Sequence, residues 1–209
     1  MLFYRIIRFV TFPFLWAWLK IKSRDNKAKF LEKIGMPTED RPKGEIIWVH
    51  CHDFAESSEI LRCMPGGMPH KVLLTYNKRH GGGNDYGAIC QFAPIDTHMA
   101  VRNFLRFWEP ALAIRIGSEL RPYQLHLLKK NNIPSFLIGG QMSDKSYRRW
   151  KLARRFARKI VRDFTFVWAA DNRQVLLLAN LGARDIESQD LIYGGSKTKE
   201  ILHKIRQMA

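Results

Sequence analysis

The sequence predicts an α/β protein with a Rossmann-like, mostly parallel sheet and helices on its flanks. From Lys43 onward, short apolar runs rich in Val, Ile, Leu and Phe alternate with longer amphipathic stretches. A short continuous apolar run is typical of a strand buried on both faces, and a longer stretch with apolar residues at helical spacing is typical of a surface helix. A regular alternation of the two favours a doubly wound sheet.

The predicted strands and helices form one series along the chain. The strands are residues 45–50, 72–75, 111–116, 135–138 and 164–169. The helices are residues 55–63, 97–108, 123–131, 147–162 and 172–181. Asp96 is a candidate cap for the second helix, and Gly182 is suited to end the last one. Because ligands of such sheets bind beyond the carboxyl ends of the strands, we expect functional residues in the loops that follow strands.

The composition indicates a folded and strongly basic protein. The chain has 209 residues, of which 46% are hydrophobic, so it can bury a sizeable core and differs from a disordered tail. Its 35 Lys and Arg outnumber its 19 Asp and Glu, which gives a formal net charge of +16. This surplus points to an anionic partner: nucleic acid, an acidic membrane surface or a phosphorylated substrate. The cysteines match no metal-ligand spacing and are expected to be buried thiols of a cytosolic protein.

The first 22 residues are rich in aromatic and aliphatic side chains and lead into a cationic stretch. Their longest uncharged run, 9–19, has 11 residues and spans about 17 Å as a helix, against about 30 Å for the hydrocarbon core of a bilayer. Arg5 and Arg8 interrupt any longer span. We therefore expect an interfacial, membrane-associated helix, rather than a transmembrane helix or a helix of the protein core. The predicted organisation is an anchoring segment at 1–35, a linker at 36–43 and a Rossmann-like domain at 44–209.

Residues 148–162 are predicted to form a basic amphipathic helix. They contain eight basic residues in fifteen and no acid, and the apolar residues of 152–161 share one helical face. A solvated helix usually mixes both signs of charge, so this one favours binding to an anion such as a lipid phosphate. Nucleic acid is disfavoured because the chain has no recognised nucleic-acid-binding motif. The candidate lipid-phosphate residues are Arg148, Arg149, Arg154, Arg155 and Arg158.

The loop after the first predicted strand carries a candidate catalytic carboxylate. Glu56 opens the following helix, whose dipole favours an ionised side chain. Such a carboxylate can act as general base toward a substrate hydroxyl, or it can only complement the helix dipole. His50, His52 and Asp53 lie too close together in sequence to favour a metal site, so no metal is expected.

A second loop, 78–84, is rich in glycine. It lacks the spacing of a P-loop and of a dinucleotide-binding fingerprint, so a flexible turn is the preferred interpretation. This turn can still present Arg79 and His80 to an anion.

Four segments, in order, resemble the Kdo (3-deoxy-manno-octulosonic acid) transferases. The segment WVHCHDFAE is similar to the family's W-[IF]-H-A-x-S-x-G-E, and SELRP is similar to T-E-L-W-P with Arg121 in place of Trp. The segment GGQMSDKS resembles N-A-R-L-S-E-R-S, and the stretch from Leu181 resembles L-G-A followed by G-N-L-K. The matching residues include Trp48, His50, Glu56, Glu119, Leu120, Pro122, Ser143, Ser146, Gly194 and Lys197.

The resemblance implies the acceptor-binding half of a two-domain, GT-B-type inverting glycosyltransferase. Such enzymes move Kdo from CMP-Kdo to a lipid A precursor at the cytoplasmic face of the bacterial inner membrane. It implies Glu56 as the catalytic base, with Glu119, Ser143 and Lys197 binding the substrate. From the glycine-rich turn, Arg79 and His80 are added as candidate substrate-binding residues. Because the chain ends about where the family's first domain ends, we expect no cofactor on this chain and a separate CMP-Kdo-binding chain. The alternative is a non-catalytic membrane-associated module that binds lipid A phosphates.

Overall fold

The computed structural model describes residues 26–53, 58, 61, 71–78, 87–188 and 195–208. Within these residues, seven strands form one sheet in the order β3-β2-β1-β4-β5-β6-β7, and all neighbouring strands are parallel. This confirms the predicted Rossmann-like parallel sheet. The strands are β1 (Ile46–Asp53), β2 (Lys71–Lys78), β3 (Ile89–Phe92), β4 (Leu112–Ile116), β5 (Ser135–Gly140), β6 (Phe166–Ala169) and β7 (Ile186–Ser188).

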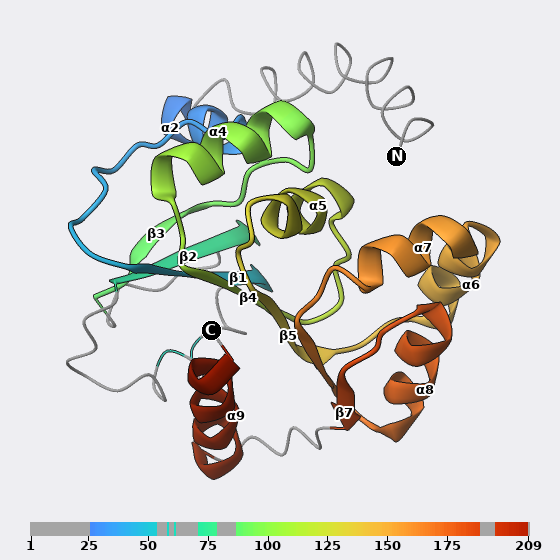
Figure 1. Cartoon of the computed structure of the whole chain (residues 1–209). Coiled ribbons are helices and arrows are strands. Elements are labelled where there is room, and N and C mark those ends of the chain that lie inside the picture. Colours follow the sequence, from blue (N-terminus) through green and yellow to red (C-terminus); the bar gives the residue numbers. More distant parts are fainter. Residues whose placement is uncertain are drawn as a thin grey trace.

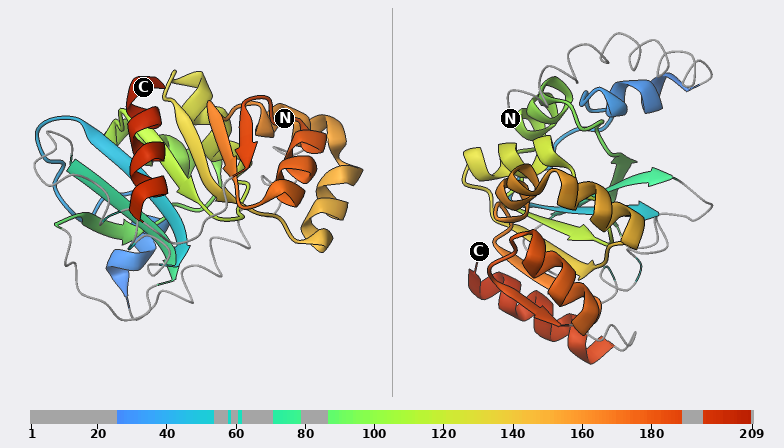
Figure 2. Two further views of the ribbon diagram at one scale, coloured as in Figure 1. Left: turned by 90° about the horizontal axis from the view of Figure 1, so that it is seen from below. Right: turned by 90° about the vertical axis from the view of Figure 1, so that its right-hand side faces the viewer.

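Helices cover both faces of the sheet. Figure 1 shows α4, α5 and α7 on one side of the sheet and α9 on the other, and the two views of Figure 2 show the same layers from other directions. The helices are α2 (Lys27–Lys33), α4 (His98–Trp108), α5 (Pro122–Lys130), α6 (Asp144–Leu152), α7 (Arg154–Val161), α8 (Asn172–Leu181) and α9 (Gly195–Met208).

The buried side chains explain this layering. Apolar residues of the central strands contact α4 and α5 on one face, and the ring of Trp48 lies 4.5 Å from that of Phe104 in α4. Alternate residues of the same strands face the other way, toward Ile201 and Ile205 of α9. Burial on both faces is the reason why the strands read as continuous apolar runs. Helices α7 and α8 pack together with β5 and β6 around a third cluster.

Two helix ends can be compared with the sequence. The cap of α4 is Thr97 and not Asp96, which corrects the prediction: the Asp96 carboxylate instead accepts hydrogen bonds from the backbone N–H groups of Tyr123 and Gln124 at 3.3 and 3.0 Å, at the start of α5. Gly182 ends α8 as predicted, with φ of 119°. A side chain there would also collide with Arg158.

The predicted single helix at 147–162 is wrong, because the chain turns at Ala153 and forms α6 and α7 instead. Ala157, Ile160 and Val161 are buried as expected. Leu152, however, is 91% exposed, although the periodicity placed it on the buried face. Because the helix axis changes direction at Ala153, Leu152 at the end of α6 is not aligned with the buried apolar residues of α7 and faces outward.

Most of the predicted anchoring segment at 1–35 lies outside the described residues, since 1–25 are not described. No helix in the described ranges is long and apolar enough to cross a bilayer. The remaining part, α2, packs against the domain: the buried Glu32 accepts a hydrogen bond from the backbone N–H of Phe92 at 2.6 Å. Gly35, with φ of 82°, lies so close to the Ala100 carbonyl that no side chain would fit. The division into domains stays a prediction.

Candidate functional site

Polar side chains gather where the central strands end, on the face covered by α4 and α5. Side chains alternate between the faces of a strand, so His50 and His52 of β1 share the face of Trp48, and Thr75 and Asn77 of β2 share that of their neighbour Leu73. The strand order reverses between β1 and β4. The crevice at such a reversal is where open α/β sheets bind ligands.

Glu119 is the centre of this polar group, in the loop from β4 to α5. One carboxylate oxygen accepts hydrogen bonds from Asn77 Nδ2 at 3.0 Å and from Arg121 Nε at 2.9 Å. The other oxygen lies 3.2 Å from His52 Nδ1. Arg115 also donates to the Glu119 carbonyl at 3.1 Å. Contacts from β1, β2 and the start of α5 therefore hold this carboxylate, and Arg115 of β4 holds the backbone of the same residue. Glu119, Asn77, Arg121, His52 and Arg115 are called the Glu119 network below.

His50 lies beside the network, two residues before His52 on the same face of β1. Its side chain is 3% exposed, and Nε2 lies 3.9 Å from Glu119 Oε2 without a hydrogen-bond partner among the described residues. Its Nδ1 lies 3.0 Å from the Thr75 hydroxyl, which accepts a hydrogen bond from the Trp48 indole N–H at 2.8 Å. When this hydroxyl donates to Nδ1, the neutral ring carries its own proton on Nε2, facing the carboxylate. Burial, with the charge of Arg121, lowers the pKa of His50 well below its ordinary value, so the ring is neutral.

The Glu119 carboxyl is ionised throughout the physiological pH range. Burial alone would raise its pKa, but the interactions with His50 and Arg121 outweigh burial and hold the pKa well below its usual range. An effective general base has a pKa near the working pH, so this carboxylate is a weak base. An ionised oxygen is, however, a strong hydrogen-bond acceptor. Glu119 is therefore suited to orient a hydroxyl-bearing ligand rather than to take its proton.

Two cations border the carboxylate. The Arg121 guanidinium also donates to the carbonyl of Pro94 at 2.9 Å and to Asn77 Oδ1 at 2.5 Å. Lys33 of α2 lies near this edge, with its Nζ 5.4 Å from the centre of the Phe92 ring at the end of β3. Burial, Arg121 and Lys29 lower its pKa to about 8. This edge of the sheet thus suits a ligand that carries both hydroxyl and acidic groups. In the part of the chain that the structure describes, no three His, Cys, Asp or Glu side chains are grouped as metal ligands.

The structure does not bring the predicted substrate-binding residues together in one place. Glu119 lies at the centre of the network. Ser143 caps α6, where its hydroxyl accepts a hydrogen bond from the Ser146 N–H at 3.3 Å, and no hydrogen bond between described residues joins it to Glu119. Lys197 lies in the first turn of α9, where the structure describes the backbone and not the side chain. Three predicted site residues lie outside the described ranges: Glu56, Arg79 and His80.

The predicted lipid-phosphate arginines lie on the surface. All five are exposed, and no ion pair of the described residues involves them. They surround the exposed Leu152 in the sequence. The arginines are Arg148 and Arg149 on α6, and Arg154, Arg155 and Arg158 on α7.

Sequence reasoning missed the partners that hold Glu119. Asn77 was not singled out, and His52 was considered only as a metal ligand. One signal was present: Leu73, Thr75 and Asn77 alternate along β2, so polarity rises toward the carboxyl end of one face. A buried strand that becomes polar on one face as it ends is a sign of a site at that edge.

Comparisons with known proteins point to the same family as the sequence motifs. The family model described as 3-deoxy-D-manno-octulosonic-acid transferase (kdotransferase) matches residues 28–190. This range includes both Glu56 and Glu119 and ends before Lys197.

Individual relatives carry the same description. The chain is 28% identical over 142 residues to a probable mitochondrial 3-deoxy-D-manno-octulosonic acid transferase of Arabidopsis thaliana, covering 64% of this chain and 32% of the relative. It is 32% identical over 159 residues to the 3-deoxy-D-manno-octulosonic acid transferase of Rickettsia felis, covering 72% and 34%. For the same transferase of Rickettsia bellii, the identity is 25% over 199 residues, covering 86% and 46%. The chain thus spans less than half the length of each of these relatives.

Proposed function

This chain belongs to the 3-deoxy-D-manno-octulosonic-acid transferase family, and we propose that it forms the acceptor-binding domain of an enzyme that transfers Kdo in lipopolysaccharide synthesis. The proposed acceptor is a lipid A precursor and the proposed donor is CMP-Kdo. The reaction takes place at the cytoplasmic face of the bacterial inner membrane. Family membership supports the reaction class, and the Glu119 network supports a binding site on this domain.

The observation that carries the proposal is the ionised Glu119 carboxylate at the reversal of the strand order. A sugar acceptor presents hydroxyl groups, which can donate hydrogen bonds to this carboxylate. Its phosphates are complementary in charge to Lys33, whereas each guanidinium nitrogen of Arg121 already donates to Glu119, Pro94 or Asn77. One site can therefore orient the sugar through the carboxylate, which Arg121 holds in place, and attract its acidic groups through Lys33.

The transfer itself needs a second carboxylate, for which we assign Glu56. In this reaction Glu56 accepts the proton of the acceptor hydroxyl. The hydroxyl oxygen forms a bond to the anomeric carbon of Kdo as the bond from that carbon to the CMP phosphate breaks, and CMP leaves with the bonding electrons. Glu119 is poorly suited to this step because its pKa is held low. Glu56 is thus the proposed base and Glu119 a positioning residue.

The CMP-Kdo donor requires a nucleotide-binding domain, and we propose that a second domain supplies it. Such a domain would close over the carboxyl ends of β1 and β4, where the acceptor is bound. A reconstituted mixture of the two domains tests this part of the proposal.

The proposed contact with the anionic membrane surface is formed by α6 and α7. Their exposed arginines have no ion-pair partners among the described residues, and an anionic lipid surface attracts each such cation by about 1 kcal/mol. Leu152, 91% exposed between them, can enter the headgroup region. This combination of an exposed apolar side chain and unpaired cations is typical of a membrane-binding surface.

The test uses the full chain with a lipid A precursor in detergent micelles, followed by addition of a CMP-Kdo-binding domain. We expect binding by the chain alone and transfer after the addition. Glu56→Gln should then lower the transfer rate about a hundredfold to ten-thousandfold, because the amide cannot accept the proton. Glu39→Gln, at an exposed residue of the predicted linker, is the matched control.

Three outcomes would change the assignment. Undiminished transfer by the Glu56→Gln protein would end the role of Glu56 as base. Binding of the precursor without transfer, whatever donor domain is added, would favour the non-catalytic module that binds lipid A phosphates. Absence of binding would contradict the proposed function itself.

A further inference from the structure

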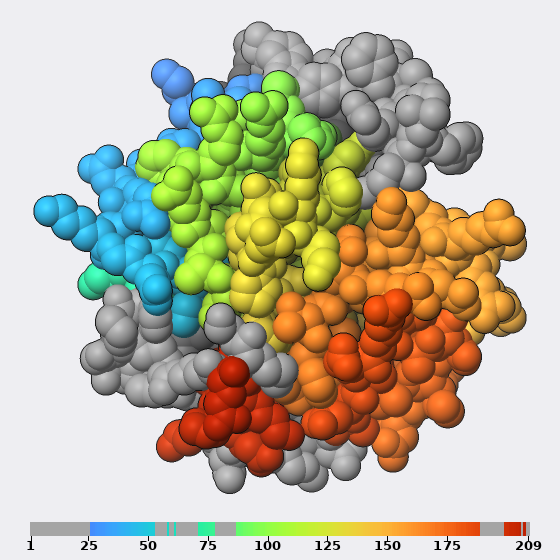
Figure 3. Space-filling view, viewed as in Figure 1, coloured from blue at the N-terminus to red at the C-terminus, as the bar shows by residue number. Residues whose placement is uncertain are grey.

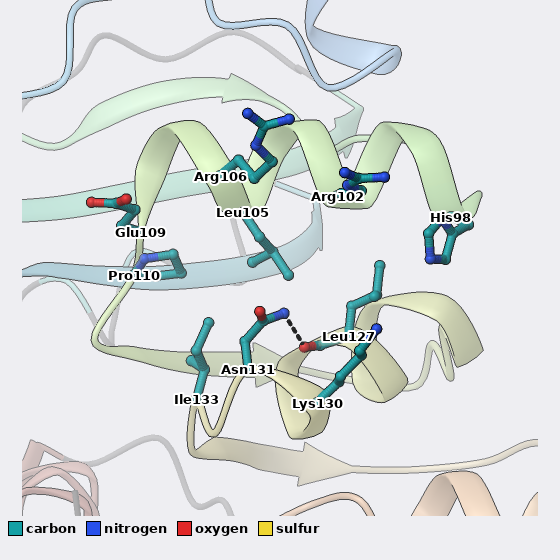
Figure 4. A pocket seen from close by; sticks show the side chains of 10 residues that line it. All are labelled: His98, Arg102, Leu105, Arg106, Glu109, Pro110, Leu127, Lys130, Asn131 and Ile133. Carbon is teal, nitrogen blue, oxygen red and sulfur yellow. Dashed lines mark hydrogen bonds between the residues drawn. The ribbon is translucent and has the colours of Figure 1, made fainter.

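A concave groove lies between α4 and α5, on the outer side of the helix layer (Figure 4). Its volume is about 690 Å³, and it shares no lining residue with the Glu119 network. Leu105, Leu127 and Ile133 form its apolar floor, where Figure 4 shows them pointing into the space between the two helices. The groove is therefore a second concave surface, separate from the proposed acceptor site.

Three cations border the groove without being neutralised. Arg102 and Arg106 come from α4 and Lys130 from the end of α5, and all three are exposed. No ion pair of the described residues involves any of them. Unpaired cations around a concave surface concentrate positive potential inside it. The one acid of the lining, Glu109, lies at the end of the groove opposite His98 (Figure 4).

The groove is part of a larger basic surface, which we call the basic helix layer and define as α4, α5, α6 and α7. These helices carry two, two, four and four Lys or Arg residues, in that order, against the single acid Asp144. Figure 3 shows α4, α5 and α7 side by side on one face of the molecule. Their fields overlap: besides burial, Lys159 of α7 and Lys130 of α5 both lower the pKa of His126.

We infer that the groove between α4 and α5 binds the phosphate-bearing headgroup of an anionic glycerophospholipid, such as phosphatidylglycerol. Arg102 and Lys130 contact the phosphate, Arg106 adds positive potential at the rim, the glycerol hydroxyls donate hydrogen bonds to Glu109, and the apolar floor receives the first methylene groups. The inference rests on the proposed function only for its membrane location. A bound headgroup would fix how the domain sits on the bilayer.

The lining favours a lipid over the other polyanion in question, nucleic acid. Single-stranded nucleic acids stack their bases on aromatic side chains, and the lining contains no Phe, Tyr or Trp. Its apolar residues are aliphatic, which suits the glycerol backbone and acyl chains of a lipid. The cations come from two walls of one groove rather than from an extended track, which suits a single phosphate group.

The first experiment measures co-sedimentation of the full chain with vesicles of phosphatidylglycerol and phosphatidylcholine, and with vesicles of phosphatidylcholine alone. The groove variant is Arg102→Gln with Lys130→Gln, which removes one cation from each wall. The control is Lys71→Gln with Arg184→Gln, which removes the same charge from exposed sites outside the basic helix layer. We expect the groove variant to lose about tenfold or more in affinity for the anionic vesicles and the control less than about twofold. Equal losses in the two variants would overturn the groove as a site.

The second experiment separates the groove from the general charge of the layer. Glycerophosphoglycerol, the deacylated headgroup, is titrated into the full chain by calorimetry. We expect saturable binding by the unmodified chain and by Arg149→Gln with Arg155→Gln, but not by the groove variant. Equal affinity for inorganic phosphate would reduce the groove to a simple anion site, and displacement by an acidic peptide would assign it to a protein partner; either result overturns the proposal. Neither donor nor lipid A precursor is present, so failure of the transfer reaction leaves this result unaffected.

Discussion

The Glu119 network and the basic helix layer are both charged, but their charges are arranged differently: those of the network are partly buried and paired, whereas those of the layer are mostly exposed and of one sign. In the network, Glu119 is matched by Arg121, and Asn77 and His52 complete its contacts. In the layer, twelve cations accompany one acid. Paired charges fix side-chain geometry over a few ångströms, whereas unpaired charges create a field that acts at longer range. The network is therefore suited to orient one ligand, and the layer to attract an anionic surface.

The largest expected contrast between the two regions is in stability. Arg121→Leu should lower the free energy of unfolding by about 2 kcal/mol, because it leaves a partly buried carboxylate without its cation. Arg155→Leu removes an equal charge from the exposed layer and should change stability by no more than about 0.5 kcal/mol. Urea denaturation measures both values. Equal destabilisation by the two substitutions would break the comparison.

For membrane binding, substitutions in the basic helix layer should have a larger effect than substitutions in the Glu119 network. Arg154→Gln with Arg155→Gln should weaken binding to anionic vesicles by about 2 kcal/mol, or roughly thirtyfold, at low salt. The difference from the unmodified chain should shrink as salt rises, since exposed charges are screened. Co-sedimentation at a series of salt concentrations measures this. Binding that does not respond to salt would remove α6 and α7 from the membrane contact.

Leu152 separates the apolar part of membrane binding from the electrostatic part. Leu152→Ser should weaken vesicle binding by about 1 kcal/mol, since part of the side chain leaves water on binding. It should leave the free energy of unfolding unchanged, because the side chain is 91% exposed. Both quantities are read from the same protein preparation. A loss of stability would show that Leu152 packs against the domain after all.

The prediction that depends on pH concerns Lys33. Its pKa is lowered from 10.5 to about 8, first by burial and then by Arg121 and Lys29. The unfolded chain therefore holds this proton more tightly than the folded one, and the resulting destabilisation is present below pH 8 and is lost as the pH rises from 8 toward 10.5. Stability should rise over this range, and Lys33→Met should flatten the rise. Parallel pH curves for the two proteins would contradict the assignment.

The fold could be predicted where segments are long and regularly patterned. The five predicted strands correspond to β1, β2, β4, β5 and β6. The strands β3 and β7 were missed, because ICQF and IES are short and partly polar and form the two edges of the sheet. The turn at Ala153 was missed for a different reason. The apolar residues on both sides of it follow one helical period, and this pattern does not reveal a change in the direction of the helix axis.

The site could be predicted only in part, because its contacts join strands far apart in the sequence. Glu119 was found through a resemblance, and Arg121 lies two residues away. Asn77 and His52 become its neighbours only through the parallel register, in which His50 pairs with Thr75. The low pKa of Glu119 likewise depends on tertiary contacts, which no local pattern reveals.

The most direct test of the account compares Glu119→Gln with the matched control Glu39→Gln in binding of a lipid A precursor by the full chain. The amide keeps the shape of Glu119 but removes the charge that Arg121 and the acceptor hydroxyls require, and a charged hydrogen bond contributes about 1.5–3 kcal/mol. We expect Glu119→Gln to weaken binding about tenfold to a hundredfold and Glu39→Gln to leave it unchanged, with circular dichroism confirming that both proteins are folded. A folded Glu119→Gln protein that binds the precursor with undiminished affinity would contradict the assignment of the Glu119 network as the acceptor site.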